Sequence, residues 1–169
     1  LVVEDMASAW QHVRRHAAAH PPLSQGGPQR LPPASGGVTA WKFRDPDGHP
    51  LELLAFPEGH WPPHWKDAER RSLNAPALGI DHTAIGTRAP QDAVRFYEEL
   101  LGLALTSRHL NEGVEQQRLD GLASLGEARV EVIGLAPAHA TPHLELLGYR
   151  AALAYPPHAR GLGSFTVFE

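Results

Sequence analysis

Two glutamates and one histidine lie at positions where strands of this composition would normally place core residues. Glu52, in PLELLAF, and Glu145, in HLELLGY, each share one strand face with apolar neighbours at a spacing of two. His82, in GIDHTAIGT, shares a face with Ile80 and Ala84. An unpaired carboxylate among apolar side chains is costly, so a metal ion, an arginine or a substrate must offset its burial. One imidazole and two carboxylates are suitable donors for a divalent metal.

From spacing alone, a structural role is the simpler interpretation of the same three residues. The glutamates could pair with Arg44, Arg129 or Arg150, and His82 could be a hydrogen-bonded core residue. The spacing therefore leaves both a metal site and structural pairing open.

Turn signals and hydrophobic periodicity predict the elements that must position these residues. The expected elements are a strand end at 1–3, a helix from Met6 to about His20, a hairpin over 38–56, a strand at 79–87, a helix from Pro90 to about Leu101, and strands at 103–107, 115–119, 129–135 and 143–149. DPDG predicts the hairpin turn, and Gly102 the end of the second helix. That helix should bury an apolar face formed by Val94, Phe96, Tyr97, Leu100 and Leu101.

The order of elements indicates an internal repeat. PLELLAF (50–56) and HLELLGY (143–149) share LELL followed by a small residue and an aromatic residue. LVVEDMASAW can be aligned with IGTRAPQDAV, so that Leu1 falls opposite Ile85. The offsets of 84 and 93 residues differ by nine, which loop insertions can absorb. On this alignment the counterpart of His82 would precede Leu1, so a fragment of a longer chain is one expectation that the sequence leaves open.

Several motifs together resemble the vicinal oxygen chelate superfamily, which includes glyoxalase I, extradiol dioxygenases, bleomycin resistance proteins and methylmalonyl-CoA epimerase. The motifs are GIDHTAI, the helical RFYEELLGL, the terminal HLELLGY and FRDPDGHPLELLAF. GVEQQRLDGL followed by RVEVIGL is similar to the middle strands of one of its modules. The resemblance implies an α+β fold in which paired βαβββ modules form a curved, half-open mixed sheet around a cavity.

The resemblance also implies a metal site. His82 matches a first-strand ligand, and Glu52 and Glu145 match last-strand ligands. The implied cofactor is a divalent metal ion (Fe, Mn, Ni or Zn) that binds two neighbouring oxygens of a small substrate. Glu52 or Glu145 would also act as a catalytic general base, and Tyr149, four residues beyond Glu145, would contact the substrate.

The expected organisation is a partial module without its first strand (1–56), a connector (57–77), a second module (78–150) and a tail (151–169) that resembles the first strand of a further module. In that tail Phe165 stands where His82 would align, so no ligand is offered there. Whether Glu52 shares one site with His82 and Glu145 depends on how the modules pair. In the connector, Trp61 and Trp65 are expected to pack across the module boundary.

Composition narrows the function classes. The 169 residues carry a net charge of -4, which argues against nucleic-acid binding, and the absence of cysteine excludes thiolate chemistry. No apolar run approaches the roughly 20 residues that span a bilayer. We therefore expect a cytoplasmic protein with a small-molecule substrate, no nucleic-acid or membrane partner, and a homodimer as one possible assembly.

Two functions from different classes remain open. The first is a metal-dependent enzyme, either a lyase or isomerase or a ring-cleaving dioxygenase. The second is a metal-free protein that sequesters a small ligand, as bleomycin resistance proteins do. Glu52, His82 and Glu145 favour the first, whereas Phe165 and the tryptophans favour the second.

Overall fold

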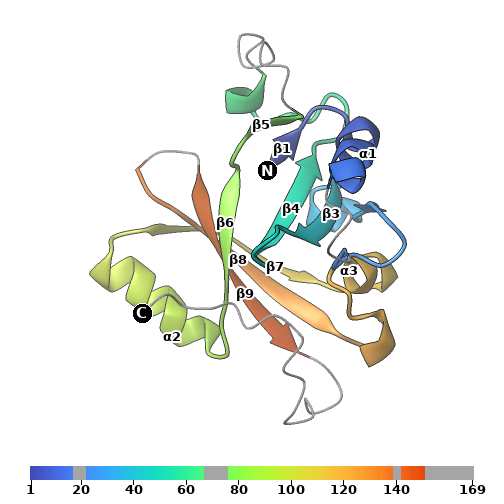
Figure 1. Cartoon of the computed structure of the whole chain (residues 1–169). Helices are drawn as coiled ribbons and strands as arrows, with labels where there is room; N and C mark the ends of the chain where they lie inside the picture. Colours follow the sequence, from blue (N-terminus) through green and yellow to red (C-terminus); the bar gives the residue numbers. More distant parts are fainter. Residues whose placement is uncertain (17–21, 67–75, 139–141, 151–169) are drawn as a thin grey trace.

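The computed structural model describes residues 1–16, 22–66, 76–138 and 142–150, whose strands form two open sheets (Figure 1). The first sheet has the order β2-β3-β4-β1-β5, and the second β6-β9-β8-β7. The elements are β1 Val2–Val3, α1 Met6–His16, β2 Gln29–Arg30, η1 Pro33–Ser35, β3 Thr39–Arg44, β4 Pro50–Ala55, η2 Pro63–Trp65, β5 Ala77–Gly79, β6 His82–Gly86, α2 Pro90–Arg95, η4 Phe96–Leu100, β7 Ala104–Asn111, α3 Val114–Leu119, η5 Ala123–Leu125, β8 Arg129–Ala136 and β9 His143–Arg150. Among the described residues, no helix is long and apolar enough to cross a membrane.

The two sheets repeat one topology, so the fold is α+β with two mixed sheets built from βαβββ-like modules. β2-β3-β4-β1 in the first sheet corresponds to β7-β8-β9-β6 in the second. The first and last strands of each module run parallel, and the other pairs within the module are antiparallel. Val2 pairs with Leu54, and Gly86 pairs with Leu147. These pairs are equivalent under the sequence alignment, so the predicted repeat is confirmed.

Helix α1 covers one face of the first sheet. The Asp5 carboxylate accepts the backbone N–H groups of Ala7 and Ser8, at 3.0 and 3.3 Å, and so caps the first turn. Met6 and Ala9 are buried in a core that also contains Val3, Trp41, Phe43, Leu53 and Ala55. The described helix ends at His16, and residues 17–20 of the predicted helix lie outside the described residues.

Residues 115–119 form a helix, so the predicted strand there is wrong. β7 ends at Asn111, and Gly113, at φ +97°, directly precedes α3, which begins at Val114. The buried residues of α3 are Gln116 and Leu119, three positions apart as one helix face requires. Leu119 packs with Leu31, Ala40 and Leu54 of the first module, so α3 joins the second module to the first.

The helix after β6 has the predicted length but is less buried than predicted. α2 continues as the π-helical η4, and Gly102, at φ +68°, follows its last turn. Val94 is 6% exposed in the core of the second sheet, and Tyr97 packs against it. The other predicted core residues, Phe96, Leu100 and Leu101, are more than half exposed. Of the predicted apolar face, only Val94 and Tyr97 therefore contact the core of the second sheet.

Candidate metal centre

The strand predicted at 79–87 is interrupted where the chain passes from one sheet to the other. β5 ends at Gly79 as an edge strand of the first sheet, and β6 begins at His82 in the second (Figure 1). Asp81 therefore lies between the two sheets, and it is 7% exposed. Its backbone carbonyl accepts the N–H of His143 at 3.0 Å, which joins this junction to the start of β9.

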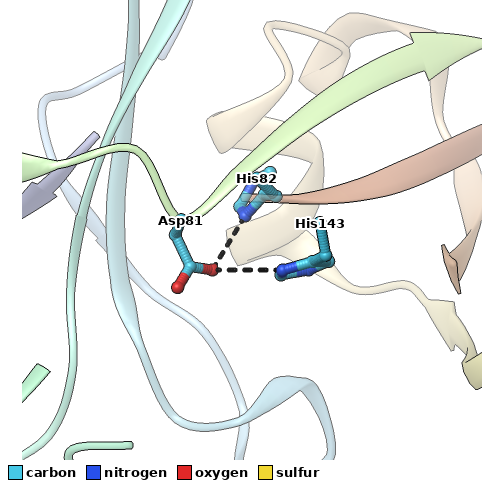
Figure 2. A group of neighbouring side chains, drawn as sticks. All are labelled: Asp81, His82 and His143. Carbon is cyan, nitrogen blue, oxygen red and sulfur yellow. Dashed lines mark hydrogen bonds and ion pairs between the residues drawn. The ribbon is translucent and has the colours of Figure 1, made fainter. Parts of the chain in front are cut away.

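Three side chains converge at the junction, as Figure 2 shows. Asp81 Oδ2 lies 3.1 Å from Nδ1 of His82 and 4.0 Å from Nδ1 of His143. The donor atoms of this group all lie within 4.8 Å of one another, so Asp81, His82 and His143 form a possible metal site. The parallel register of β6 and β9 places His82 directly beside His143.

The second nitrogen of His82 faces the two glutamates that the sequence singled out. Nε2 of His82 lies 3.8 Å from Oε2 of Glu52, on β4, and 3.6 Å from Oε2 of Glu145, on β9. His143 Nε2 lies 3.5 Å from Oε1 of Glu145. The structure thus brings together Glu52, His82 and Glu145, which come from both sheets.

These separations are longer than good hydrogen bonds, but they suit ligands of a common ion. Two donor atoms at about 2.1 Å from one tetrahedral ion lie about 3.4 Å apart. The distances around His82 Nε2 are close to this spacing, at 3.6 and 3.8 Å. Each of these two His–Glu pairs therefore has the chemistry and the spacing of two ligands of one divalent cation.

The charges around His82 favour a cation. Burial lowers the pKa of His82, but the carboxylates of Asp81, Glu52 and Glu145 outweigh it and raise the pKa to about 10. Burial raises the pKa of Glu52, but Lys42 and His82 outweigh it, so the net pKa lies below the ordinary value. The pKa of Asp81 is also lowered, because hydrogen bonds from His82 and Trp65 outweigh its burial. The carboxylates of Glu52 and Asp81 thus stay ionised at neutral pH.

Tyr149, the predicted substrate contact, lies in a neighbouring polar group. Burial is the main cause that raises its pKa, and its hydroxyl hydrogen-bonds to Asp120. Lys42 also contacts Asp120, at 2.5 Å, and stands opposite Glu52 in the register of β3 and β4. Tyr149 therefore belongs to a polar group that adjoins Glu52.

The arginines considered as partners of the glutamates are engaged elsewhere. Arg44 donates to the carbonyl of Gly48 at 2.6 Å. Arg129 lies 3.6 Å from Glu112, and Arg150 lies 3.5 Å from Glu131. In the part of the chain that the structure describes, the alternative in which these arginines pair with Glu52 or Glu145 is therefore not observed.

Sequence reasoning missed Asp81 and His143 as members of this site. His143 precedes Glu145 by two residues, so period two already places both on one strand face. Asp81 precedes His82 and would point to the opposite face of a continuous strand. Only the break between β5 and β6 brings its carboxylate to the imidazole.

A second His and carboxylate group, Asp45, Asp47 and His49, lies in the hairpin turn. Asp45 accepts the N–H groups of Asp47 and His49, at 3.0 and 2.8 Å, and contacts His49 Nδ1 at 2.9 Å. These bonds account for the turn itself, so this group is structural.

The fold and the site define an α+β protein of βαβββ-like modules with a possible metal site between its two sheets. The sequence model "Glyoxalase/Bleomycin resistance protein/Dioxygenase superfamily" matches residues 79–168, a range that includes Asp81, His82, His143 and Glu145. The chain belongs to this superfamily. A search of curated proteins found no match.

Solved structures provide more distant similarities. Glyoxalase I from Zea mays is 14% identical with a TM-score of 0.45, and the match covers 90% of this chain and 42% of that one. Its V278E variant is 15% identical with the same TM-score, with coverage of 89% and 44%. A glyoxylase/bleomycin resistance protein/dioxygenase domain from Frankia sp. EAN1pec is 14% identical with a TM-score of 0.24, with coverage of 88% and 92%. The chain thus spans less than half of the Zea mays structures that it matches.

Proposed function

We propose that this chain binds one divalent metal ion through Glu52, His82 and Glu145 and acts as a lyase or isomerase on a small oxygenated substrate. The observation that carries the proposal is His82 Nε2, which faces one carboxylate from each sheet at 3.8 and 3.6 Å. Two carboxylates that face one imidazole attract a cation, and without a metal the imidazole itself carries the positive charge, because its pKa is raised to about 10. His143, beside Glu145, could add a further donor.

The metal would act as a Lewis acid on two neighbouring oxygens of the substrate, which makes the adjacent carbon more acidic. The residues would supply the proton transfer. Glu52 and Glu145 flank the same point from opposite sheets, so either carboxylate could take a proton from that carbon and return it to a neighbouring atom. The lowered pKa of Glu52 keeps it ionised as a base at neutral pH. Tyr149 would contact a polar group of the substrate next to Glu52.

A second candidate is an Fe(II) dioxygenase. The group of Asp81, His82 and His143 contains two imidazoles and one carboxylate within 4.8 Å. This composition is that of the facial triad of non-haem Fe(II) oxygenases. The two candidates use different atoms of His82, so they can be separated.

The test is the metal content of chain purified without chelator or affinity metal, followed by reconstitution with Fe(II), Mn, Ni and Zn. The proposal expects about one metal per chain, lost in His82→Ala and strongly reduced in Glu52→Gln and Glu145→Gln. His49→Ala, in the exposed hairpin group, is the matched control and should keep the metal. Iron retained in both glutamine variants would favour the dioxygenase, whereas no metal in any form would favour a metal-free binding protein.

A further inference from the structure

His82 can offer a metal either of two ring nitrogens, and its surroundings distinguish them. Nδ1 lies 3.1 Å from Asp81 Oδ2, within hydrogen-bonding distance. Nε2 faces Glu52 and Glu145 at distances too long for good hydrogen bonds. A proton on Nδ1 that is donated to Asp81 therefore leaves Nε2 directed at the two glutamates.

Asp81 is itself held in place by the connector between the modules. The indole Nε1–H of Trp65, in η2, donates to Asp81 Oδ1 at 2.7 Å. Trp65 is 3% exposed, and its ring packs so closely on Gly79 that a Cβ there would lie 2.8 Å from Cη2. Both oxygens of Asp81 are thus engaged, one with Trp65 and the other with His82.

We propose that Asp81 is a positioning residue, held by Trp65, that orients His82 so that Nε2 and not Nδ1 binds the metal. The inference rests on the metal site proposed above and assigns a role to a residue outside its ligand set. A carboxylate that accepts the second N–H of a ligating imidazole fixes the ring and raises its basicity as a ligand. For Asp81 to act as a ligand itself, with the Nδ1 atoms of His82 and His143, its hydrogen bond to His82 would have to break.

The first measurement is the zinc affinity of the full chain and its variants, by competition with a chromogenic chelator. Asp81→Ala should bind Zn²⁺ about 10 to 100 times more weakly, as is typical when a partner of a ligating histidine is removed. Trp65→Phe keeps the charge of Asp81 but removes the indole N–H that donates to it. We therefore expect a smaller loss of zinc affinity, about tenfold.

Two controls match these variants. Asp45→Ala removes the carboxylate of another Asp–His contact, in the exposed hairpin turn. Trp41→Phe removes a buried indole whose Nε1 makes no hydrogen bond within the described residues. Both should bind Zn²⁺ as the original chain does. Circular dichroism of each variant separates a loss of affinity from a loss of fold.

The second measurement reads the protonation of the site in the original chain. Side-chain ¹H–¹⁵N correlation spectra of the Zn²⁺-loaded chain report which nitrogen of each histidine carries a proton, and His82 is assigned by the signals lost in His82→Ala. The inference expects a protonated Nδ1 and a zinc-bound Nε2.

The outcomes separate the inference from the proposal on which it rests. Zinc bound to Nδ1 of His82, or full affinity in Asp81→Ala, would overturn the positioning role and leave the metal site intact. Failure of the original chain to bind zinc or any other divalent metal would overturn the metal site itself, and the inference with it.

Discussion

Lys42 is a cation held between carboxylates from both modules. Its Nζ lies 2.5 Å from Asp120 Oδ1, and the two side chains are 18% and 4% exposed. Burial lowers the pKa of Lys42, but the charges of Glu52 and Asp120 outweigh it and raise the pKa well above 10.5. The ammonium group thus stays charged and balances Asp120, which would otherwise be a buried and unpaired carboxylate.

Lys42→Met should destabilise the fold strongly, because it removes the partner of Asp120. Breaking a buried pair on one side typically costs about 3–5 kcal/mol. Urea unfolding should show this loss, while Lys42→Met combined with Asp120→Leu should recover part of it. Lys66→Met, at an exposed lysine, serves as the control. A single variant as stable as the original chain would contradict the role of the pair.

Period-two spacing was enough to choose Glu52, His82 and Glu145 as candidate donors, because the side-chain direction in a strand is a local property. The same spacing did not identify Asp81 as the hydrogen-bond partner of His82. Asp81 reaches His82 only because the chain leaves one sheet at Gly79 and enters another at His82. Such a break depends on how two sheets pack, and no local pattern encodes it.

Helix α1 depends on its cap. Asp5 accepts the N–H groups of Ala7 and Ser8 and the hydroxyl of Ser8. The hydrogen bonds from Ser8 and Ala7 lower the pKa of Asp5 below 3.8. A lowered pKa means that the charged cap stabilises the fold above this pH and that the contribution is lost as the pH falls through the folded-state value.

Asp5→Ala should therefore lower the melting temperature at neutral pH, and the difference from the original chain should shrink as the pH falls below 3.8. Asp5→Asn is the matched variant, because asparagine also caps a helix but does not titrate. It should remain close to the original chain at neutral pH. A deficit of Asp5→Ala that is equally large in acid would show that the charge of Asp5 has no part in the cap.

Helix α3 shows where local patterns failed. GVEQQRLDGL was expected to contain a strand, yet the buried positions are three apart. The deciding contact is Leu119, which enters a core made by residues of the first module. The packing of Leu119 against the first module is therefore a tertiary signal, which the segment's own sequence does not contain.

Leu119→Ala should lower the free energy of unfolding by about 2–5 kcal/mol, the usual range for a fully buried leucine. Leu119 is 1% exposed, whereas Val114, at the start of the same helix, is 47% exposed. Val114→Ala should therefore be nearly neutral in urea unfolding. If both variants unfold alike, α3 does not anchor the second module on the first.

The repeat also shapes the candidate site, because the last strand of each module places one glutamate beside His82. Glu52 on β4 and Glu145 on β9 are counterparts in the alignment of the two modules, and both face His82. The order of elements and the shared LELL motif predicted the repeat, and the resemblance to a known superfamily implied the topology of each module. The sequence left the pairing of the modules open, and the structure places Glu52 beside the donors of the second sheet.

A metal bound by donors from both sheets should stabilise the two modules together. A ligand that binds only the folded state raises the free energy of unfolding by about 2.7 kcal/mol when its concentration is 100 times its Kd. Zn²⁺ at such an excess should therefore raise the unfolding midpoint of the original chain in a single cooperative transition, and a chelator should reverse the change. In Glu52→Gln the first sheet loses its donor, so added Zn²⁺ should stabilise this variant much less. Equal stabilisation of both chains would place the ion within the second sheet alone, on Asp81, His82 and His143.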